Sequence, residues 1–180
     1  DFSIKPDLSI ICFNSNQLIG NGFTIPSGPL RENLSSLKRT DCIFINGDKN
    51  INFEKKLRNI NSNIKIFYSK YQIKHIEKFK NKEVVAFAGI GNPQNFFQLL
   101  KENGINLIKT FSFPDHHNYS QFDYDNLINE IEYKQNLIIV TTEKDYCRID
   151  EINKKKFDYV EVNLKIENKD EFINLIKSKI

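Results

Sequence analysis

The sequence contains no methionine and no tryptophan, and it has only three cysteines, five prolines and seven glycines among its 180 residues. It begins with Asp1 rather than an initiator methionine, so we expect a fragment or a processed piece of a longer protein. No apolar run approaches the roughly 20 residues that a helix needs to cross a bilayer, and no signal peptide is visible. The length suits one domain, or one domain with part of another.

The cysteine pattern argues against a cysteine-based metal site, and the net charge argues against nucleic-acid binding. The cysteines lack the spacing of metal ligands, and an odd number without a pattern is typical of a reducing compartment. Cys12 and Cys42 lie in apolar runs, which predicts buried free thiols, whereas Cys147 is interpreted as an incidental thiol. A net charge of +3 is too small to indicate nucleic-acid binding, although it is compatible with anionic ligands or an anionic membrane surface.

Apolar runs alternate with helix signals along the chain. We expect strands at residues 8–13, 41–46, 64–68, 83–88, 105–113, 137–140 and 157–166. We expect helices at residues 34–38, 53–57, 93–103, 121–134 and 169–177. From residue 83 onward this order predicts an α/β fold with a mostly parallel sheet and helices on both faces. The polar and charged region 63–82 is interpreted as a linker or domain boundary.

The stretch Phe113-Pro114-Asp115-His116-His117-Asn118-Tyr119 places two of the three histidines side by side after an aspartate. It follows an expected strand, which is where open α/β sheets bind their ligands, and Ser120-x-x-Asp123 then reads as a capping box. Asp115 with His116 could act as a general acid or base, ligate a metal, bind phosphate, or form a hydrogen-bonded turn without function. No further ligands are spaced to complete a metal site. His75 is interpreted as a solvated side chain.

Two more loops follow expected strands. In Thr141-Thr142-Glu143-Lys144-Asp145, Lys144 could reach an anion and Asp145 could orient it, or Thr142 could simply cap a helix. If the sheet is parallel, this loop and the histidine stretch lie at the same edge. Gly89-Ile90-Gly91-Asn92-Pro93 is too short for a dinucleotide fingerprint, and it is interpreted as a tight turn from a strand into a helix.

A loop near the start of the chain is rich in glycine and proline. Gly20-Asn21-Gly22 contains the Asn-Gly signal of a hairpin turn, and Pro26-Ser27-Gly28-Pro29-Leu30-Arg31-Glu32 follows it. Several of these residues have restricted backbone angles, so the loop could hold Arg31 and Glu32 rigidly. A plain surface loop fits the same residues.

Four of these motifs together resemble the tetraacyldisaccharide 4'-kinase family. They are Gly20-Asn21-Gly22 with Pro26-x-Gly28-Pro29-Leu30-Arg31-Glu32, Phe87-Ala88-Gly89-Ile90-Gly91-Asn92-Pro93-x-x-Phe96-Phe97, Phe113-Pro114-Asp115-His116-His117-x-Tyr119, and Thr141-Thr142-Glu143-Lys144-Asp145-x-x-Arg148. They occur in the order found in that family. The resemblance implies a P-loop NTPase-like core and a smaller α/β domain, joined by a two-stranded linker. The motif Gly-x-x-x-x-Gly-Lys-[Ser/Thr] is absent from this chain.

The resemblance implies a division of the chain. Residues 1–62 would be the end of the nucleotide-binding core, 63–82 the linker and 83–180 the smaller domain, with a return strand and the last helix near 157–180. The main elements that bind ATP and Mg²⁺ would lie in an N-terminal P-loop part of the same enzyme. We therefore expect the 180-residue chain alone to be inactive.

The resemblance also implies an activity. Such kinases transfer the γ-phosphate of ATP to the 4'-hydroxyl of a lipid A disaccharide precursor, as peripheral enzymes at the cytoplasmic face of the bacterial inner membrane. His116, beside Asp115, would assist the base that activates the attacking hydroxyl, with its carboxylate partner in the N-terminal part. Residues assigned to substrate or phosphate binding are Arg31, Glu32, Asn21, Lys144 and Asp145, and none is assigned to a metal site. The alternatives are a non-catalytic module that binds sugar phosphate or nucleotide, and a metal-dependent phosphohydrolase.

Overall fold

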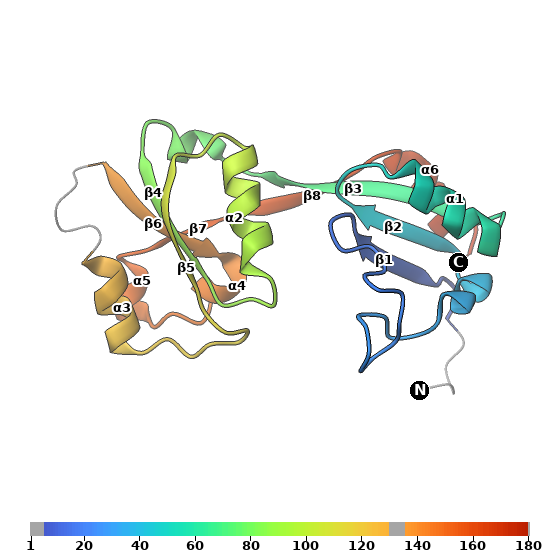
Figure 1. Ribbon diagram of the computed structural model, residues 1–180. Helices are drawn as coiled ribbons and strands as arrows, with labels where there is room; N and C mark the ends of the chain where they lie inside the picture. The colour runs from blue at the N-terminus through green and yellow to red at the C-terminus, as the bar shows by residue number, and fades with distance from the viewer. Residues whose placement is uncertain (1–5, 130–135, 180) are drawn as a thin grey trace. The chain divides into compact units, whose positions relative to one another are not determined.

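The computed structural model describes residues 6–129 and 136–179. The chain forms two compact units: unit 1 is Asp1–Tyr71 with Leu164–Ile180, and unit 2 is Gln72–Asn163. Figure 1 shows a sheet with its helices in each of them. Strands β3 (Lys65–Ile73) and β8 (Val162–Ile166) both include the boundary, so the chain passes between the units twice.

Unit 1 is built on a four-stranded sheet with the order β1-β2-β3-β8. Strands β1 (Ile10–Asn14), β2 (Cys42–Asn46) and β3 pair in parallel. The helices of this unit are the 3-10 helix η1 (Leu34–Arg39), α1 (Ile51–Ile60) and α6 (Lys169–Lys177). Asn50 caps α1, because its side chain accepts a hydrogen bond from the Phe53 N–H at 2.9 Å.

The apolar run of β2 explains why helices cover both faces of this sheet. Ile43 and Ile45 point to one face and join a core with α1 and η1. Cys42 and Phe44 alternate to the other face, where α6 packs. Phe44 meets Phe172 of α6 edge to face, with ring centroids 4.7 Å apart.

Unit 2 contains a second four-stranded sheet, with the order β5-β4-β6-β7 and parallel pairing throughout. The strands are β4 (Glu83–Ala88), β5 (Leu107–Ser112), β6 (Leu137–Thr142) and β7 (Asp158–Val160). The helices are the 3-10 helix η2 (Ile76–Phe79), α2 (Pro93–Glu102), α3 (Gln121–Ile128), α4 (Glu143–Tyr146) and α5 (Glu151–Lys154).

Strand β4 is buried on both faces, as its unbroken apolar sequence predicts. Val84, Ala86 and Ala88 point to one face of the sheet and share a core with α2. Val85 and Phe87 point to the other face and share a core with α3. Pro93 occupies the start of α2, and Ser120 with Asp123 forms the expected capping box of α3. The prediction of an α/β fold with mostly parallel sheets and helices on both faces is confirmed.

The structure differs from three sequence expectations. The expected strand 157–166 is two strands, β7 in one sheet and β8 in the other, because the chain leaves unit 2 at this point. The helix expected near the end of the smaller domain, α6, instead packs on unit 1. Cys12 is exposed because β1 lies at the edge of its sheet, whereas Cys42 is buried as predicted. The final turns of the helix expected at 121–134 lie outside the described residues.

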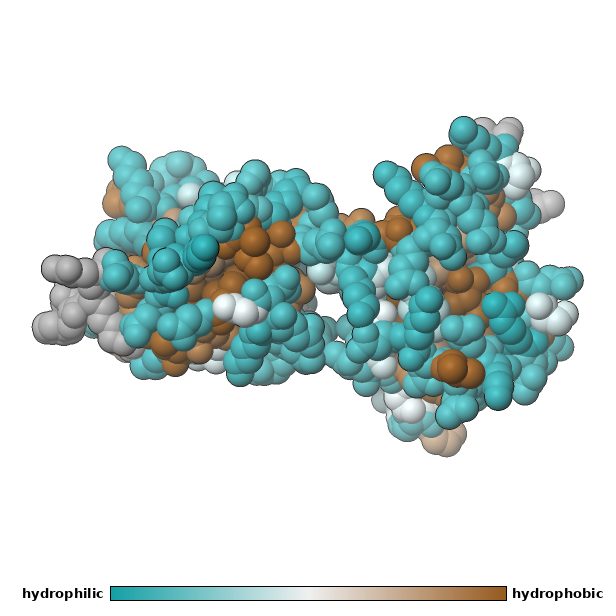
Figure 2. Space-filling view, turned by 90° about the horizontal axis from the view of Figure 1, so that it is seen from above, coloured by the Kyte–Doolittle hydropathy of each residue, from teal (hydrophilic) through white to brown (hydrophobic). Residues whose placement is uncertain are grey.

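The face drawn in Figure 2 is mostly hydrophilic, with brown apolar residues in patches between polar ones. The large apolar side chains that remain exposed include Phe23, Ile51, Phe122 and Ile152. Isolated exposed residues of this kind are normal in folded proteins and indicate no site by themselves. In the part of the chain that the structure describes, every helix is too short or too polar to cross a membrane.

Candidate functional site

Three loops of unit 2 follow the carboxyl ends of neighbouring strands. They are residues 89–92 after β4, residues 113–119 after β5 and the turn from β6 directly into α4. The helix after β4 packs on one face of the sheet, while the helix after β5 packs on the other. A sheet whose connections reverse in this way has a crevice at the carboxyl edge, which is the usual ligand site of open α/β sheets.

Asp115, His116 and Lys144 meet at this edge. The Lys144 ammonium lies 3.2 Å from Asp115 Oδ1 and 3.4 Å from His116 Nε2, and Asp115 Oδ2 lies 3.9 Å from the same ring nitrogen. The hydrogen bond from Lys144 lowers the pKa of Asp115. The role of Nε2 in this contact depends on the tautomer of the imidazole. An imidazole ring can both accept and donate a proton.

The two adjacent histidines have different surroundings. His116 is 71% exposed at the end of its loop, whereas His117 is 26% exposed. The His117 ring stacks on Phe113 with centroids 4.9 Å apart, and its Nε2 lies 3.2 Å from Asp123 Oδ2. His117 therefore belongs to the packing of the loop on α3, and His116 is the histidine that can reach a ligand.

Asp145 is buried beneath this edge and has no exposed surface. Its Oδ2 accepts hydrogen bonds from Gly89 N at 3.0 Å and from the Thr142 hydroxyl at 2.8 Å. Its Oδ1 lies 3.9 Å from Arg148 Nη1. Burial, followed by the negative charge of Asp145, raises the pKa of the nearby Tyr119 phenol, which stays protonated. The hydrogen bonds of Asp145 are made within the protein through Oδ2, while its Oδ1 is buried without a hydrogen-bond partner among the described residues.

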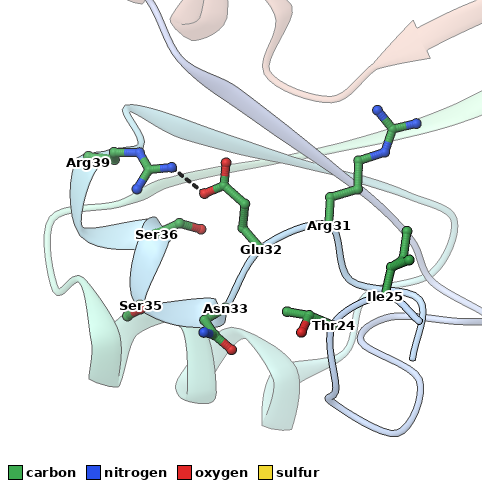
Figure 3. A pocket seen from close by; sticks show the side chains of 8 residues that line it. All are labelled: Thr24, Ile25, Arg31, Glu32, Asn33, Ser35, Ser36 and Arg39. Atoms are coloured by element: carbon green, nitrogen blue, oxygen red, sulfur yellow. Dashed lines mark hydrogen bonds and ion pairs between the residues drawn. The ribbon is translucent and has the colours of Figure 1, made fainter. Parts of the chain in front are cut away.

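A second cluster of sequence-identified residues lies in unit 1. A cavity of about 440 Å³ is lined by Thr24, Ile25, Arg31, Glu32, Asn33, Ser35, Ser36 and Arg39. Figure 3 shows the Glu32 carboxylate paired with Arg39, while the Arg31 side chain extends away from this pair. Arg31 has no hydrogen-bond or ion-pair partner among the described residues. Two guanidinium groups and several hydroxyls form a polar cavity that suits a phosphate-bearing ligand.

Asn21 organises the loop that leads to this cavity. Its amide nitrogen donates to Ser27 O at 2.7 Å, and its Oδ1 accepts from Phe23 N at 3.1 Å. A side chain at Gly28 would collide with Asn21 Oδ1, which a Cβ would approach to 2.2 Å. The structure thus places Asn21 within the loop scaffold, and Gly28 is needed because the backbone passes so close.

The described residues contain no group of three or more His, Cys, Asp or Glu side chains that could hold a metal ion. Mg²⁺ needs fewer protein ligands, since it is commonly bound through one or two carboxylates and the phosphates of a nucleotide. The Glu32 carboxylate is exposed, and because its Oε2 pairs with Arg39, its Oε1 is the oxygen that could serve as such a single ligand. No other residue of this cavity carries a carboxylate.

The structure brings Asp115, His116 and Lys144 together in unit 2, and Arg31 with Glu32 in unit 1. Two residues of these clusters had no role in the sequence interpretation. Arg148 lies three residues after Asp145, and that spacing on a helical turn is a signal for an ion pair. Arg39 lies seven residues after Glu32, and this spacing gives no local indication in the sequence that the two side chains form an ion pair.

The fold is that of an α/β protein with parallel sheets and helices on both faces. The side chains at its strand ends, a histidine, a lysine and an aspartate, are of the kind that performs acid–base or phosphate chemistry. Comparison with known proteins gives the family. The family described as Tetraacyldisaccharide-1-P 4'-kinase matches residues 1–180. The chain belongs to this family of kinases.

Individual relatives agree with this assignment. The Tetraacyldisaccharide 4'-kinase of Pelagibacter ubique (strain HTCC1062) is 41% identical over 181 residues, which cover 98% of this chain and 57% of that protein. The protein of the same name from Rickettsia canadensis (strain McKiel) is 36% identical over 178 residues, covering 97% of this chain and 51% of that protein. The chain thus spans about half the length of these curated relatives.

A solved structure shares the fold. The LpxK protein of Aquifex aeolicus, crystallised in complex with ATP, matches with a TM-score of 0.65 and 22% identity. The match covers 97% of this chain and 53% of that one. It supports the α/β architecture of the units.

Proposed function

We propose that this chain takes part in transferring the γ-phosphate of ATP to the 4'-hydroxyl of a tetraacyldisaccharide 1-phosphate, a step of lipid A biosynthesis. The observation that carries the proposal is the exposed His116 imidazole, held beside Lys144 and Asp115 at the carboxyl edge of a sheet. Membership of a family of sugar-lipid kinases supplies the reaction. Phosphoryl transfer depends mainly on positioning and charge stabilisation, which polar residues at a sheet edge can provide.

His116 would help remove the proton from the attacking hydroxyl. Its imidazole is exposed, and such a ring can accept a proton or support a carboxylate that does. Assistance of this kind is worth ~10²–10⁴-fold in rate. Lys144, which is half-exposed, is placed to contact the negative charge of a phosphate while Asp115 orients it.

Arg31, Glu32 and Arg39 would contact the phosphates of a ligand. Arginine forks bind phosphate oxygens through two hydrogen bonds, and Arg31 has no protein partner among the described residues. Glu32 would supply one oxygen ligand to Mg²⁺. When bound, that ion neutralises developing negative charge on the phosphates. In this proposal Asn21 and Asp145 serve the scaffold rather than the ligand.

The remaining parts of the proposal concern the rest of the enzyme. Unit 1 would belong to the end of the nucleotide-binding core, unit 2 would be the smaller domain, and β3 with β8 would be the two-stranded linker. An N-terminal phosphate-loop part would be the partner of this chain. The substrate is a lipid, which suits a peripheral position at the cytoplasmic face of the inner membrane.

A chimera tests this function. The portion of the Pelagibacter ubique relative outside the aligned region would be joined to residues 1–180, and phosphate transfer from ATP to a tetraacyldisaccharide 1-phosphate would be measured. We expect turnover by the chimera and none by the 180-residue chain alone, because the chain lacks the Gly-x-x-x-x-Gly-Lys-[Ser/Thr] loop. A folded chimera without turnover would contradict the proposal.

A non-catalytic binding module is the second candidate, favoured by the polar cavity of unit 1, in which Arg31 has no partner among the described residues. It predicts that the isolated chain binds ATP or the disaccharide phosphate and that the chimera remains inactive. Calorimetric titration of both ligands into the chain, beside the turnover assay, separates the two functions. A metal-dependent phosphohydrolase is tested by metal analysis of the purified chain, in which a stoichiometric transition metal would favour it.

A further inference from the structure

His116 has a backbone conformation that must be held in place. Its φ is +59°, in the left-handed region, where a residue other than glycine is disfavoured. Such residues persist only where the surrounding structure determines them, and they gather at functional sites. The side chain of His116 is mostly exposed and cannot supply this restraint itself.

The restraint comes from the peptide groups on either side of the residue. The His116 N–H donates to Gly89 O at 3.1 Å, and the His116 carbonyl accepts a hydrogen bond from Arg148 Nη2. Arg148 Nη2 also donates to Asn118 Oδ1 at 3.2 Å. One guanidinium group thus fixes the loop on both sides of His117.

Asp145 bonds to the first of these contacts through Gly89 and lies beside the second, where its Oδ1 and Arg148 Nη1 are both buried without a hydrogen-bond partner among the described residues. Its Oδ2 accepts from the Gly89 N–H at 3.0 Å, while its Oδ1 faces Arg148 Nη1 at 3.9 Å. Gly89 therefore has its N–H held by Asp145 and its carbonyl held by His116. A Cβ at Gly89 would lie 2.9 Å from the Tyr119 hydroxyl and 3.2 Å from Asp145 Oδ1, so a side chain here would press on both groups.

We propose that Asp145 and Arg148 are positioning residues, which hold the His116 peptide in its left-handed conformation and so set the direction of the imidazole. Their role in a reaction rests on the proposed function of His116. Both act through His116 and Gly89, and neither needs to touch the substrate. The alternative is that they stabilise unit 2 as a whole, without any particular effect on the histidine loop.

Nuclear magnetic resonance of the labelled 180-residue chain separates these roles. A strong nuclear Overhauser effect between the amide and α protons of His116 reports its positive φ, and amide exchange reports its hydrogen bond to Gly89. The variants are Arg148→Met, Arg148→Lys, Asp145→Asn and the double variant Asp145→Asn/Arg148→Met. Lys154→Met is a matched control, because Lys154 forms an ion pair with Glu151 at the same three-residue spacing, and its exposure of 23% is close to the 25% of Arg148.

We expect Arg148→Met and Asp145→Asn each to abolish the His116 signature. The hydrogen-exchange rate of the His116 amide should be at least about tenfold higher than in the control variant. A change of this size corresponds to the loss of one hydrogen bond from a charged donor, here Arg148. In the double variant, the exchange rate of the His116 amide should be close to that of either single variant, because the two residues act in one network. Arg148→Lys, which keeps the charge but loses the planar fork, should give a smaller increase confined to the same loop.

A retained positive-φ signature in folded Arg148→Met would overturn the proposal, and so would an equal rise in exchange at all amides of unit 2. If Arg148→Met does not fold, Arg148→Lys decides the question, and an unchanged His116 amide then rejects the positioning role. None of these readouts requires turnover. An inactive chimera would thus reject the proposed function alone, and a retained signature would reject the positioning role alone.

Discussion

Substitutions of the two adjacent histidines should change the free energy of unfolding for different reasons, the backbone conformation at His116 and the side-chain contacts at His117. Replacing His116 by glycine removes the cost of a left-handed residue, roughly 1–2 kcal/mol, and adds the entropy cost of glycine, roughly 0.5–1 kcal/mol. The difference predicts that His116→Gly is more stable than His116→Ala by about 0.5–1 kcal/mol, since only the latter keeps a Cβ at φ +59°.

His117→Ala should instead destabilise unit 2. It removes the contact with Asp123 at 3.2 Å, worth about 1 kcal/mol, and the stacking on Phe113, worth about 0.5–1.5 kcal/mol. The sum predicts a loss of about 1.5–2.5 kcal/mol in the free energy of unfolding, before any compensation by the remaining aromatic cluster.

Hydrogen exchange in increasing urea, read by mass spectrometry on peptides of unit 2, is a suitable assay. Segment resolution is needed because two units need not unfold together, and a single transition would then be undefined. Peptides of unit 1 provide the internal control. The reasoning is refuted if His116→Gly is less stable than His116→Ala, or if His117→Ala leaves the stability of unit 2 unchanged.

Three further predictions follow from the charges, a buried thiol and the last helix. The hydrogen bond from Lys144 lowers the pKa of Asp115. The pair therefore stabilises the folded state at pH values above the ordinary aspartate pKa, and this stabilisation is lost as the pH falls through the lowered pKa of Asp115. The stability difference between the chain and Lys144→Met, read by hydrogen exchange in urea on peptides of unit 2, should be present at about pH 6 and shrink as the pH falls below the ordinary aspartate pKa. Cys42 is buried with its pKa raised to about 11 by burial, so a thiol reagent at about pH 8 should spare it and modify the two exposed cysteines. Three fast-reacting thiols in the folded chain would contradict this. Phe172→Ala should cost unit 1 roughly 2–4 kcal/mol and raise exchange in β2 and β3, but not in β4 and β6.

The sequence predicted those parts of the fold whose apolar pattern is local. The run Glu83–Ala88 reads as a strand buried on both faces, and it lies at the centre of the sheet of unit 2. The alternation of residues 157–166 continues across Glu161, so it could not show that the chain leaves one sheet for another there. The sheet on which α6 packs depends on side chains more than a hundred residues earlier in the chain, which a local pattern does not contain.

The same limit applies to the candidate site. Asp115, His116 and Lys144 were found because they follow apolar runs, and parallel strands bring such positions together. Asp145 follows the same run, but the sequence could not show that its side chain turns inward to Gly89. The partnership of Arg148 with the His116 carbonyl spans 32 residues and depends on the folded loop.

The central claim is that His116 contributes to phosphoryl transfer, and the most direct test is steady-state kinetics of the chimera with His116→Ala. The expected result is a fall in kcat of ~10²–10⁴-fold with little change in KM, because general base assistance acts in the transition state. Lys154→Met in the same chimera should turn over normally. A His116→Ala chimera with the kcat of its parent would contradict the account.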